Sequence, residues 1–292
     1  MSVRLFIFGL GYAGAALARA MAGEATWVGG TVKSVDAAVT LAAEGLRTFI
    51  FDGKAAGIGV TEAIRRATHL VATIPPGDGD PALAVYRNAI LADDHLAWIG
   101  YLSTVGVYGD RGGDWVSEAT APRPTSARSV ARLEAERAWQ AVADARGVPL
   151  AILRLAGIYG PGRNAFVNLD AGTARRVVKP RQVFNRIHVD DLVATIKATL
   201  VRRAGGVFNV ADDEPAPPQD VVAFAAKTMG VAPPAETALA DADLSPTARS
   251  FYDENKRVSN ARIKSELGVT LAHPTYRDGL AALWRGDWRG GA

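Results

Sequence analysis

Short runs of apolar residues alternate with amphipathic segments through the first half of the chain. The runs are almost continuously apolar, which is typical of strands that are covered on both faces. The intervening segments have helical spacing, and Ser34 can cap one of them because its hydroxyl accepts from the free amides of a first turn. The pattern predicts a parallel sheet with helices on both faces. Predicted strands are Val3–Phe8, Thr26–Gly30, Leu46–Phe51, His69–Ile74 and Leu96–Ser103, and predicted helices are Tyr12–Met21, Ser34–Glu44, Thr61–Arg66, Leu83–Ala92 and Ser126–Arg146.

The pattern loosens after the strand Leu150–Arg154, where turn-forming residues become frequent. A domain boundary is therefore expected near Gly157. The sequence predicts a doubly wound α/β domain over residues 1–156, to which 187–212 returns, and a smaller mixed domain from 157–186 and 213–292. Later predicted elements are the strands Asn185–Val189 and Val207–Val210 and the helices Asp190–Arg202, Gln219–Met229, Asn255–Leu267 and Tyr276–Trp284.

The composition of the 292 residues is that of a globular protein, with 49% hydrophobic and 22% charged residues. The chain has no cysteine, which excludes disulfides, thiolate zinc sites and a cysteine nucleophile and fits a reducing compartment. Lysine and arginine exceed the acidic residues by only three, without a dense basic block, so no nucleic-acid partner is expected. We expect a cytoplasmic protein.

Neither a metal site nor a membrane segment is expected. The four histidines, His69, His95, His188 and His273, are far apart in the sequence, and none forms an i,i+4 pair. His188 stands beside Asp190 and Asp191, and this group could at first sight be a metal or acid–base cluster. The apolar stretch near the N-terminus is interrupted by glycines and is too short to span a bilayer.

A glycine-rich loop follows the first predicted strand and opens the first helix. In such a motif the first glycine (Gly9) makes a tight turn, the second (Gly11) admits a pyrophosphate, and the third (Gly14) allows close packing of helix on strand. The amides of Tyr12 and Ala13 lie at the helix N-terminus, where partial positive charge favours an anion. The context therefore predicts dinucleotide binding.

The end of the second strand indicates which dinucleotide is bound. An NAD site usually has an acidic residue there, bonded to the ribose 2′-hydroxyl. This chain has Thr31 and Lys33 instead, which suit a 2′-phosphate, and Asp36 falls in the next helix, where it can oppose the helix dipole. NADP is therefore favoured over NAD, with Lys33 as an ordinary surface lysine the alternative. Asp52 could accept from the adenine amino group or could simply form a turn.

Four segments after the glycine loop carry a family resemblance, and they occur in the expected order. With the loop, they resemble the extended short-chain dehydrogenase/reductase superfamily, in its NAD-dependent epimerase/dehydratase group. The resemblance covers nearly the whole chain and implies an NAD(P)-binding Rossmann domain and a smaller substrate domain, which often takes a nucleotide sugar. It also implies that the segment around His188 is a structural joint between domains, which favours a structural role over a metal or acid–base site. Relatives often dimerise through the helix at Ser126–Arg146, so a homodimer is an expectation by analogy. The four segments are Ser103–Gly109, Leu153–Arg163, Arg186–Asp191 and Glu254–Asn260.

The resemblance also implies a catalytic set of Ser/Thr, Tyr and Lys, which this chain keeps only in part. Thr104 matches the Ser/Thr position, with Ser103 beside it. Alignment on Glu136 places Arg128 at the tyrosine position and Arg132 at the lysine position, as in the atypical branch that lacks the Tyr-Lys pair. An arginine stays protonated and cannot relay a proton as tyrosine does.

The two arginines have alternative roles that the sequence leaves open. Arg132 could hydrogen-bond the cofactor ribose, and Arg128 could pair with a substrate phosphate or carboxylate through its planar fork. Either could instead be an exposed helix residue, and Arg132 could then pair with Glu136 at i+4. Candidate substrate-binding residues are Tyr108, Tyr159, Arg163 and Arg186, and candidate acids after the fifth strand are Asp110, Asp114 and Glu118.

The sequence thus favours an atypical NADP-dependent oxidoreductase or isomerase that acts on a polar, carbohydrate-like small molecule. Thr104 would polarise the substrate carbonyl, and loss of a positioned proton donor typically lowers the rate by about 10²–10⁴-fold. The alternative is a non-catalytic sensor or regulatory protein that binds NAD(P).

Overall fold

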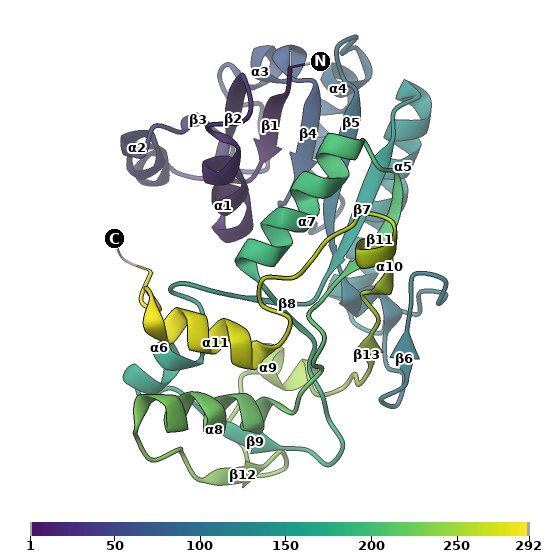
Figure 1. Ribbon diagram of the computed structural model, residues 1–292. Coiled ribbons are helices and arrows are strands. Elements are labelled where there is room, and N and C mark those ends of the chain that lie inside the picture. The colour runs from purple at the N-terminus through teal and green to yellow at the C-terminus, as the bar shows by residue number, and fades with distance from the viewer. Residues whose placement is uncertain (1, 291–292) are drawn as a thin grey trace. The chain divides into compact units, whose positions relative to one another are not determined.

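The computed structural model describes residues 2–290, and the chain divides into two compact units. The first unit comprises Met1–Val107, Ala127–Arg154 and Val193–Phe208. The second unit comprises Tyr108–Ser126, Leu155–Leu192 and Asn209–Ala292. Each unit is therefore assembled from segments that are far apart in the sequence, as the colours of Figure 1 show.

A seven-stranded parallel sheet with the order β11-β7-β5-β4-β1-β2-β3 forms the framework of the first unit. This is the doubly wound order, in which the chain turns back at β1 and leaves a crevice between the carboxyl ends of β1 and β4. The sheet confirms the fold class predicted from the apolar runs. Its strands are β1 (Arg4–Phe8), β2 (Trp27–Val32), β3 (Arg47–Ile50), β4 (His69–Ala72), β5 (Trp98–Thr104), β7 (Leu150–Leu155) and β11 (Gly206–Val210).

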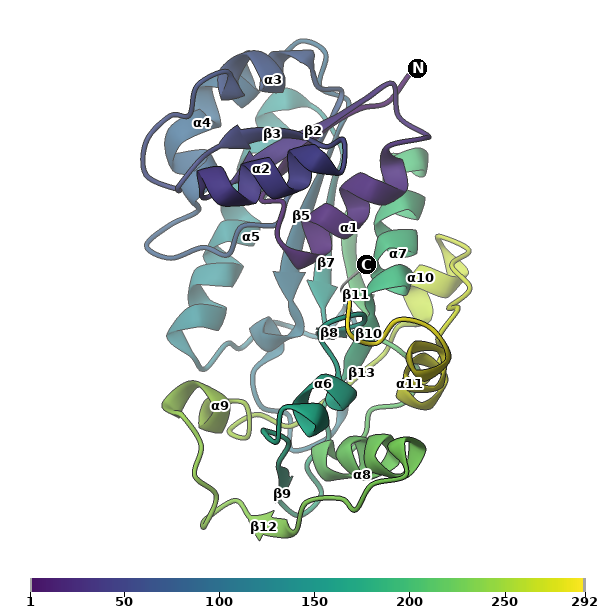
Figure 2. The same ribbon diagram turned by 90° about the vertical axis from the view of Figure 1, so that its left-hand side faces the viewer.

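Helices cover both faces of this sheet (Figure 2). One face carries a core in which Phe8 of β1 contacts Tyr86 and Trp139, with ring centroids 5.8 and 6.4 Å apart. Ser34 caps α2 as predicted, since its hydroxyl accepts from the Ala37 amide at 3.3 Å. The helices are α1 (Tyr12–Met21), α2 (Val35–Ala43), α3 (Val60–Arg66), α4 (Pro81–Leu91), α5 (Ala127–Arg146) and α7 (Val189–Arg202).

The second unit contains three two-stranded parallel pairs and several short helices. The pairs are β8 (Gly157–Tyr159) with β10 (Arg186–His188), β9 (Arg176–Val178) with β12 (Glu236–Ala238), and β6 (Trp115–Val116) with β13 (Arg257–Val258). Its helical segments are η1 (Val105–Tyr108), which begins in the first unit, α6 (Ala165–Asp170), α8 (Pro218–Met229), α9 (Pro246–Ser250), α10 (Ala261–Ser265) and α11 (Tyr276–Arg285).

One predicted helix, Asn255–Leu267, is wrong over its first half. There the chain forms β13, and only the short helix α10 follows. The reason is tertiary, because the amides of Arg257 and Ser259 donate to the carbonyls of Asp114 and Val116 on the β6 segment. A partner strand more than 130 residues earlier in the chain satisfies backbone groups that a helix would have satisfied locally.

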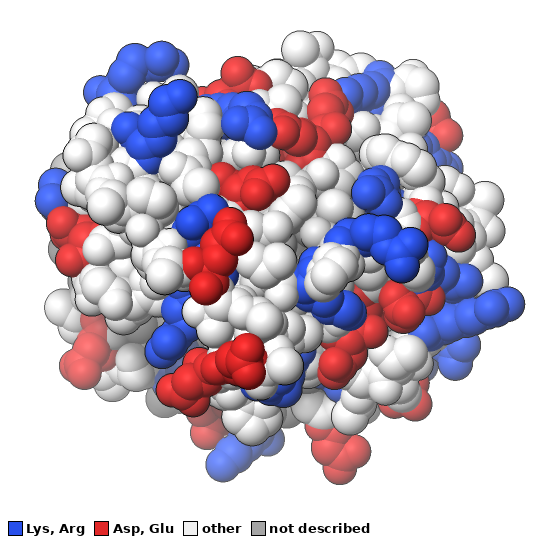
Figure 3. Space-filling view, turned by 90° about the horizontal axis from the view of Figure 1, so that it is seen from below, with Lys and Arg blue, Asp and Glu red and all other residues white. Residues whose placement is uncertain are grey.

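Over the described residues, no helix combines the length and the apolar character that crossing a membrane requires. Basic and acidic side chains are interspersed on the face drawn in Figure 3.

Candidate functional site

The glycine loop between β1 and α1 requires glycine at two positions, one because of its backbone conformation and one because of a close contact. Gly9 has φ +98°, and a Cβ there would stand 2.6 Å from Thr73 Oγ1. A Cβ on Gly14 would stand 2.1 Å from the carbonyl oxygen of Gly9, well inside van der Waals contact. Thr73, directly after β4, donates its hydroxyl to that same carbonyl at 2.6 Å. The loop is therefore held tightly against the first turn of α1.

The outer side of the same loop is open. No described atom lies within 4 Å of the place that a Cβ on Gly11 would occupy. Gly11 is the N-cap of α1 and offers no side chain to the free amides, and the first turn of the helix holds no acidic residue. The first turn of α1 therefore begins at Tyr12 and Ala13 with no side chain of Gly11 over it, and the helix dipole favours an anionic ligand there. These residues fit a pyrophosphate group.

Thr31, predicted to contact a 2′-phosphate, supports the glycine loop from β2. Its side chain is buried, and its Oγ1 accepts from the Gly9 amide at 2.8 Å. The Thr31 carbonyl also accepts from the Leu10 amide at 2.7 Å. The hydroxyl therefore fixes the backbone at Gly9.

Lys33 and Asp52 follow the ends of β2 and β3, and both are exposed. Lys33 leads into Ser34 and the N-terminus of α2, where its ammonium group can meet an anion from solvent. Asp52 forms a local turn, with Oδ1 accepting from the amides of Lys54 and Ala55 at 2.8 and 3.4 Å. These two hydrogen bonds lower the pKa of Asp52.

The carboxyl end of β5 carries the two hydroxyl residues of the predicted catalytic set. Thr104 is half-buried, and its Oγ1 accepts from the Gly106 amide at 3.1 Å. Ser103 is buried and donates to Glu136 Oε1 at 2.5 Å. Glu136, on α5, also accepts from Arg154 Nη2 at 2.8 Å and from Arg154 Nε at 3.1 Å. The Ser103 hydroxyl is thus engaged in a buried network, and Thr104 is the more accessible of the two.

The arginines at the tyrosine and lysine positions have different surroundings. Arg132 is half-buried and donates through Nη1 to the carbonyl of Leu102, while its guanidinium lies 5.9 Å from the centroid of the Tyr101 ring. Burial raises the pKa of the Tyr101 phenol, and the charge of Arg132 opposes that rise. Arg128 is exposed, near the start of α5. Arg132 therefore stabilises the end of β5, and Arg128 is the one that faces solvent.

The second unit holds the predicted substrate-binding tyrosines, and both have internal partners. Tyr108 is fully buried and donates to Asn209 Oδ1 at 2.7 Å. Tyr159 is buried beside α11, where a Cβ on Gly279 would stand 2.0 Å from its hydroxyl oxygen. Burial and the nearby carboxylate of Asp212 raise the pKa of Tyr159.

The two predicted substrate-binding arginines also lie in the second unit. Arg186 on β10 is held inside, with Nη1 donating to the carbonyls of Phe184 and Ala216 at 3.0 and 3.2 Å. Burial lowers the pKa of Arg186, and the charge of Asp212 opposes that change. Arg163 is exposed, in the turn before α6.

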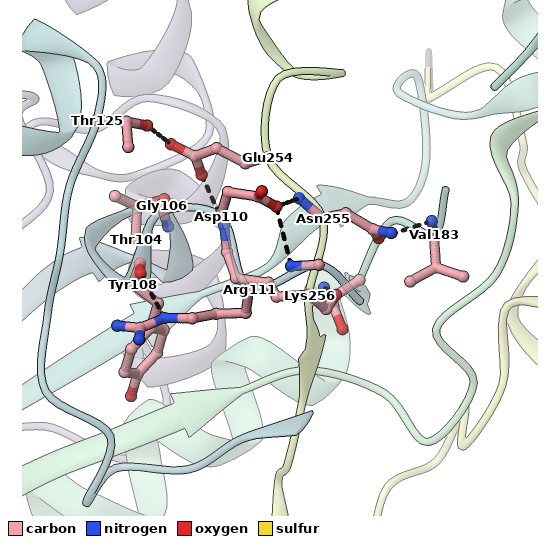
Figure 4. Close-up of polar contacts among 12 residues, drawn as sticks. Thr104, Gly106, Tyr108, Asp110, Arg111, Thr125, Val183, Glu254, Asn255 and Lys256 are labelled. Atoms are coloured by element: carbon pink, nitrogen blue, oxygen red, sulfur yellow. Dashed lines mark hydrogen bonds and ion pairs between the residues drawn. The ribbon is translucent and has the colours of Figure 1, made fainter. Parts of the chain in front are cut away.

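One of the candidate acids after β5, Asp110, contacts Asn255 in the C-terminal segment of the second unit (Figure 4). Asp110 Oδ1 accepts from the amides of Asn255 and Gly112 at 2.7 and 3.2 Å. Partial burial opposes ionisation, but these amides prevail and lower the pKa of Asp110. Glu118 accepts from the Asn209 amide at 2.8 Å, and Asp114 is exposed before β6.

Sequence reasoning missed Thr73 and Arg154, both of which contact the residues of the site. Thr73 follows the apolar run of β4, and a hydroxyl at the carboxyl end of a strand beside β1 is the signal that could have identified it. Arg154 is a charge inside the apolar strand β7, which calls for a buried anionic partner.

Comparisons with known proteins agree with this geometry. The model of the NAD-dependent epimerase/dehydratase family matches residues 9–211. A functionally unknown conserved protein from Silicibacter pomeroyi has a solved structure that is 45% identical, with TM-score 0.89 over 97% of this chain and 99% of that one. UDP-glucuronic acid 4-epimerase from Bacillus cereus, solved in complex with NAD, shares the fold at 17% identity and TM-score 0.75, over 97% of each chain.

A curated relative is named for a reduction. The 3-diazoavenalumate denitrifying reductase of a Streptomyces species is 32% identical over 176 residues, which are 55% of this chain and 54% of that protein. The matched part thus spans about half the length of that relative.

Proposed function

Because this chain belongs to the NAD-dependent epimerase/dehydratase family, we propose that it is an NADP-dependent reductase of a small polar molecule. The observation that carries the proposal is the glycine loop at the N-terminus of α1, where Gly11 has no side chain and a Cβ there would enter open space. Gly9, Gly11, Tyr12, Ala13 and Gly14 would hold the pyrophosphate. The bound nicotinamide would supply hydride.

The preference for NADP rests on Lys33. The position after β2 carries an exposed ammonium group in place of the acidic residue that bonds a ribose 2′-hydroxyl. A lysine is a point charge suited to a phosphate. Thr31 contributes indirectly, because its hydroxyl holds the loop at Gly9.

Reduction is favoured over epimerisation by the chemistry at the tyrosine position. Oxidation of a sugar hydroxyl needs a base that takes its proton, and the permanently charged Arg128 cannot serve as one. Reduction needs only an electrophile that accepts hydride, with Thr104 donating a hydrogen bond to the reacting oxygen and a proton coming from solvent. Arg128, exposed on α5, could pair with an anionic group of the substrate, such as the phosphates of a nucleotide sugar.

A diazo substrate is a second candidate, favoured by the same missing tyrosine and by the name of the Streptomyces relative. Hydride added to the carbon of an aryl diazonium ion forms a C–H bond and breaks the C–N bond, so that N₂ leaves with the bonding electron pair. The nicotinamide is oxidised and the aryl carbon reduced. No oxyanion forms, so this reaction needs no proton donor at all.

Tryptophan fluorescence on titration with NADPH and NADH tests cofactor binding, and loss of NADPH absorbance in the presence of 4-keto nucleotide sugars, simple ketones or an aryl diazonium salt tests turnover. The proposal expects tighter binding of NADPH and consumption with one of these classes. Thr104→Val should slow reduction of a ketone and leave reduction of the diazonium unchanged. Binding without turnover would favour a sensor, and failure to bind either cofactor would refute the proposal.

The double variant Arg128→Tyr/Arg132→Lys restores the family's catalytic pair. If the arginines serve the native reaction, this variant should lose native turnover. Unchanged native turnover would show that neither arginine takes part in the reaction.

A further inference from the structure

Two histidines that are far apart in the sequence meet in the second unit, together with an aspartate. His188 ends β10, Asp190 lies in the first turn of α7, and His273 lies two residues before Thr275, the N-cap of α11. Among the described residues, they form the one group of three such side chains whose donor atoms all lie within 4.8 Å of one another. Their meeting was not expected from the sequence, because 85 residues separate the two histidines.

The distances within this group are those of a metal site. Oδ2 of Asp190 lies 3.4 Å from His188 Nδ1 and 3.5 Å from His273 Nε2, and the two imidazole centroids are 4.0 Å apart. Four ligand atoms placed tetrahedrally at zinc bond lengths of about 2.0–2.1 Å stand roughly 3.3–3.4 Å from one another. The two carboxylate-to-imidazole distances therefore match this spacing to within about 0.2 Å, and the two imidazole nitrogens lie within 4.8 Å of each other.

The group is held in this arrangement by neighbouring contacts. The Asp191 carboxylate accepts from the amides of Ala272 and His273 at 2.6 and 3.0 Å, which fixes the backbone that carries His273. The His188 ring is buried edge-on to Tyr159, with centroids 5.1 Å apart and planes at 85°. Contacts of this kind, made to the ligand residues by their neighbours, orient the ligands of a metal ion.

The donor set and its access suit a divalent first-row ion. His188 is a buried imidazole, and imidazole nitrogens are common ligands of such ions. The present partner of His188 Nδ1 is the Asp190 amide, at a long 3.2 Å, which an ion would displace. Asp190 is 68% exposed, and His273 lines an open hollow with Pro274, Asp278 and Arg285, which leaves room for water as a further ligand.

We propose that His188, Asp190 and His273 form a binding site for zinc or a similar divalent transition-metal ion. Two imidazoles and a carboxylate are the ligands that such ions take when no thiolate is present. The ion would tie the start of α7 to the segment that precedes α11. This site is independent of the cofactor loop in the other unit.

The test uses the full chain, stripped with EDTA and titrated with Zn²⁺ by calorimetry and with Co²⁺ by visible absorption. The proposal expects one ion per chain with a Kd below about 10 μM, a rise in Tm on zinc addition, and Co²⁺ bands of a four- or five-coordinate ion. Binding of zinc weaker than 100 μM, or without this stoichiometry, overturns it.

Three single-residue variants test whether zinc binds at His188, Asp190 and His273. His273→Ala and the conservative Asp190→Asn, which changes an exposed carboxylate and should fold, should each weaken zinc binding at least tenfold. His95→Ala removes an exposed histidine of the other unit and should bind zinc as the wild type does. Equal affinity of Asp190→Asn and wild type, or loss of binding in His95→Ala alone, would place the ion elsewhere and overturn the proposal.

Discussion

Glu136 and Arg154 form a bidentate ion pair in the interior of the first unit, with both side chains about 5% exposed or less. Glu136 lies on α5 and Arg154 on β7, and Ser103 of β5 donates to the same carboxylate. The pair thus joins a helix to two strands, one turn along α5 from Arg132. Removal of one partner from such a pair leaves a buried charge without compensation.

Arg154→Met should therefore lower the free energy of unfolding by about 3–5 kcal/mol. The double variant Arg154→Met/Glu136→Leu should be more stable than the single variant, because no charge remains buried. Urea denaturation of the two single variants, the double variant and the wild type completes the cycle. Additive losses across the cycle would contradict the coupling inferred from the geometry.

Gly14→Ala and Gly11→Ala should separate the packing role of the loop from its binding role. The Gly14 Cβ would overlap the Gly9 carbonyl, so we expect a loss of stability of about 3 kcal/mol or more. The Gly11 Cβ enters open space and should leave Tm nearly unchanged while weakening NADPH at least about tenfold, since it stands where a phosphate would approach. Thermal denaturation and fluorescence titration measure the two effects. Similar changes in Tm and in NADPH affinity for the two variants would contradict a pyrophosphate site at Gly11.

Lys33→Glu should weaken NADPH at least about tenfold and change NADH little, because only the first cofactor carries a 2′-phosphate for the ammonium to meet. Fluorescence titration with both cofactors measures the ratio of the dissociation constants for NADPH and NADH. Arg65→Glu, a charge reversal at an exposed position of α3, is the matched control. Equal losses for NADPH and NADH would refute the role of Lys33.

Thr31→Val should weaken both cofactors to a similar degree. It removes the hydroxyl that accepts from the Gly9 amide, and leaving a buried donor without a partner costs about 1–3 kcal/mol. Urea denaturation gives the loss of stability, and titration of the same preparation with NADPH and NADH gives the loss of affinity for each cofactor. A loss confined to NADPH would instead mean that the hydroxyl contacts the 2′-phosphate directly.

His69 should make stability depend on pH between about 4 and 6.5. Burial, with a smaller contribution from Arg203, lowers its pKa from 6.5 to about 4. In that range the unfolded chain binds a proton that the folded chain does not, so the stabilisation is complete above pH 6.5 and is lost as the pH falls toward 4. This contribution should change by at most about 2 kcal/mol between pH 5 and pH 7.

The variant His69→Gln should show a smaller rise in unfolding free energy between pH 5 and pH 7 than the wild type, when both are measured by urea denaturation. Gln keeps a polar group beside the Thr68 hydroxyl, which lies 2.8 Å from His69 Nδ1. His95→Gln, at an exposed turn, controls for the loss of a histidine as such. An unaltered slope in His69→Gln would mean that His69 does not carry this dependence.

Local signals predicted most of the first unit. The buried parallel strands appear in the sequence as apolar runs because helices cover both their faces, and Ser34 marks the start of α2 by its own hydrogen bond. The glycine loop is equally local, since the turn and the helix start lie within six residues. These features need no knowledge of distant parts of the chain.

The features that the sequence did not predict depend on distant partners. The segment at Arg257 has helical spacing, yet it pairs with β6, whose position only the tertiary structure sets. The hydrogen bond from the Gly9 amide to the Thr31 hydroxyl is also tertiary, because it joins the glycine loop to β2. His188 and His273 show no sequence spacing that would reveal their contact.

Thr31 and Lys33, at the end of β2, have different surroundings, and this difference matters for protein engineering. Thr31 is buried and braces the loop, whereas Lys33 projects past the strand into solvent. If Lys33 meets the 2′-phosphate as proposed, a change at that one exposed position would alter coenzyme preference while the hydrogen bond between the Gly9 amide and Thr31 stays intact. If Thr31 and Lys33 were randomised together, a change in coenzyme specificity could not be distinguished from a disordered glycine loop.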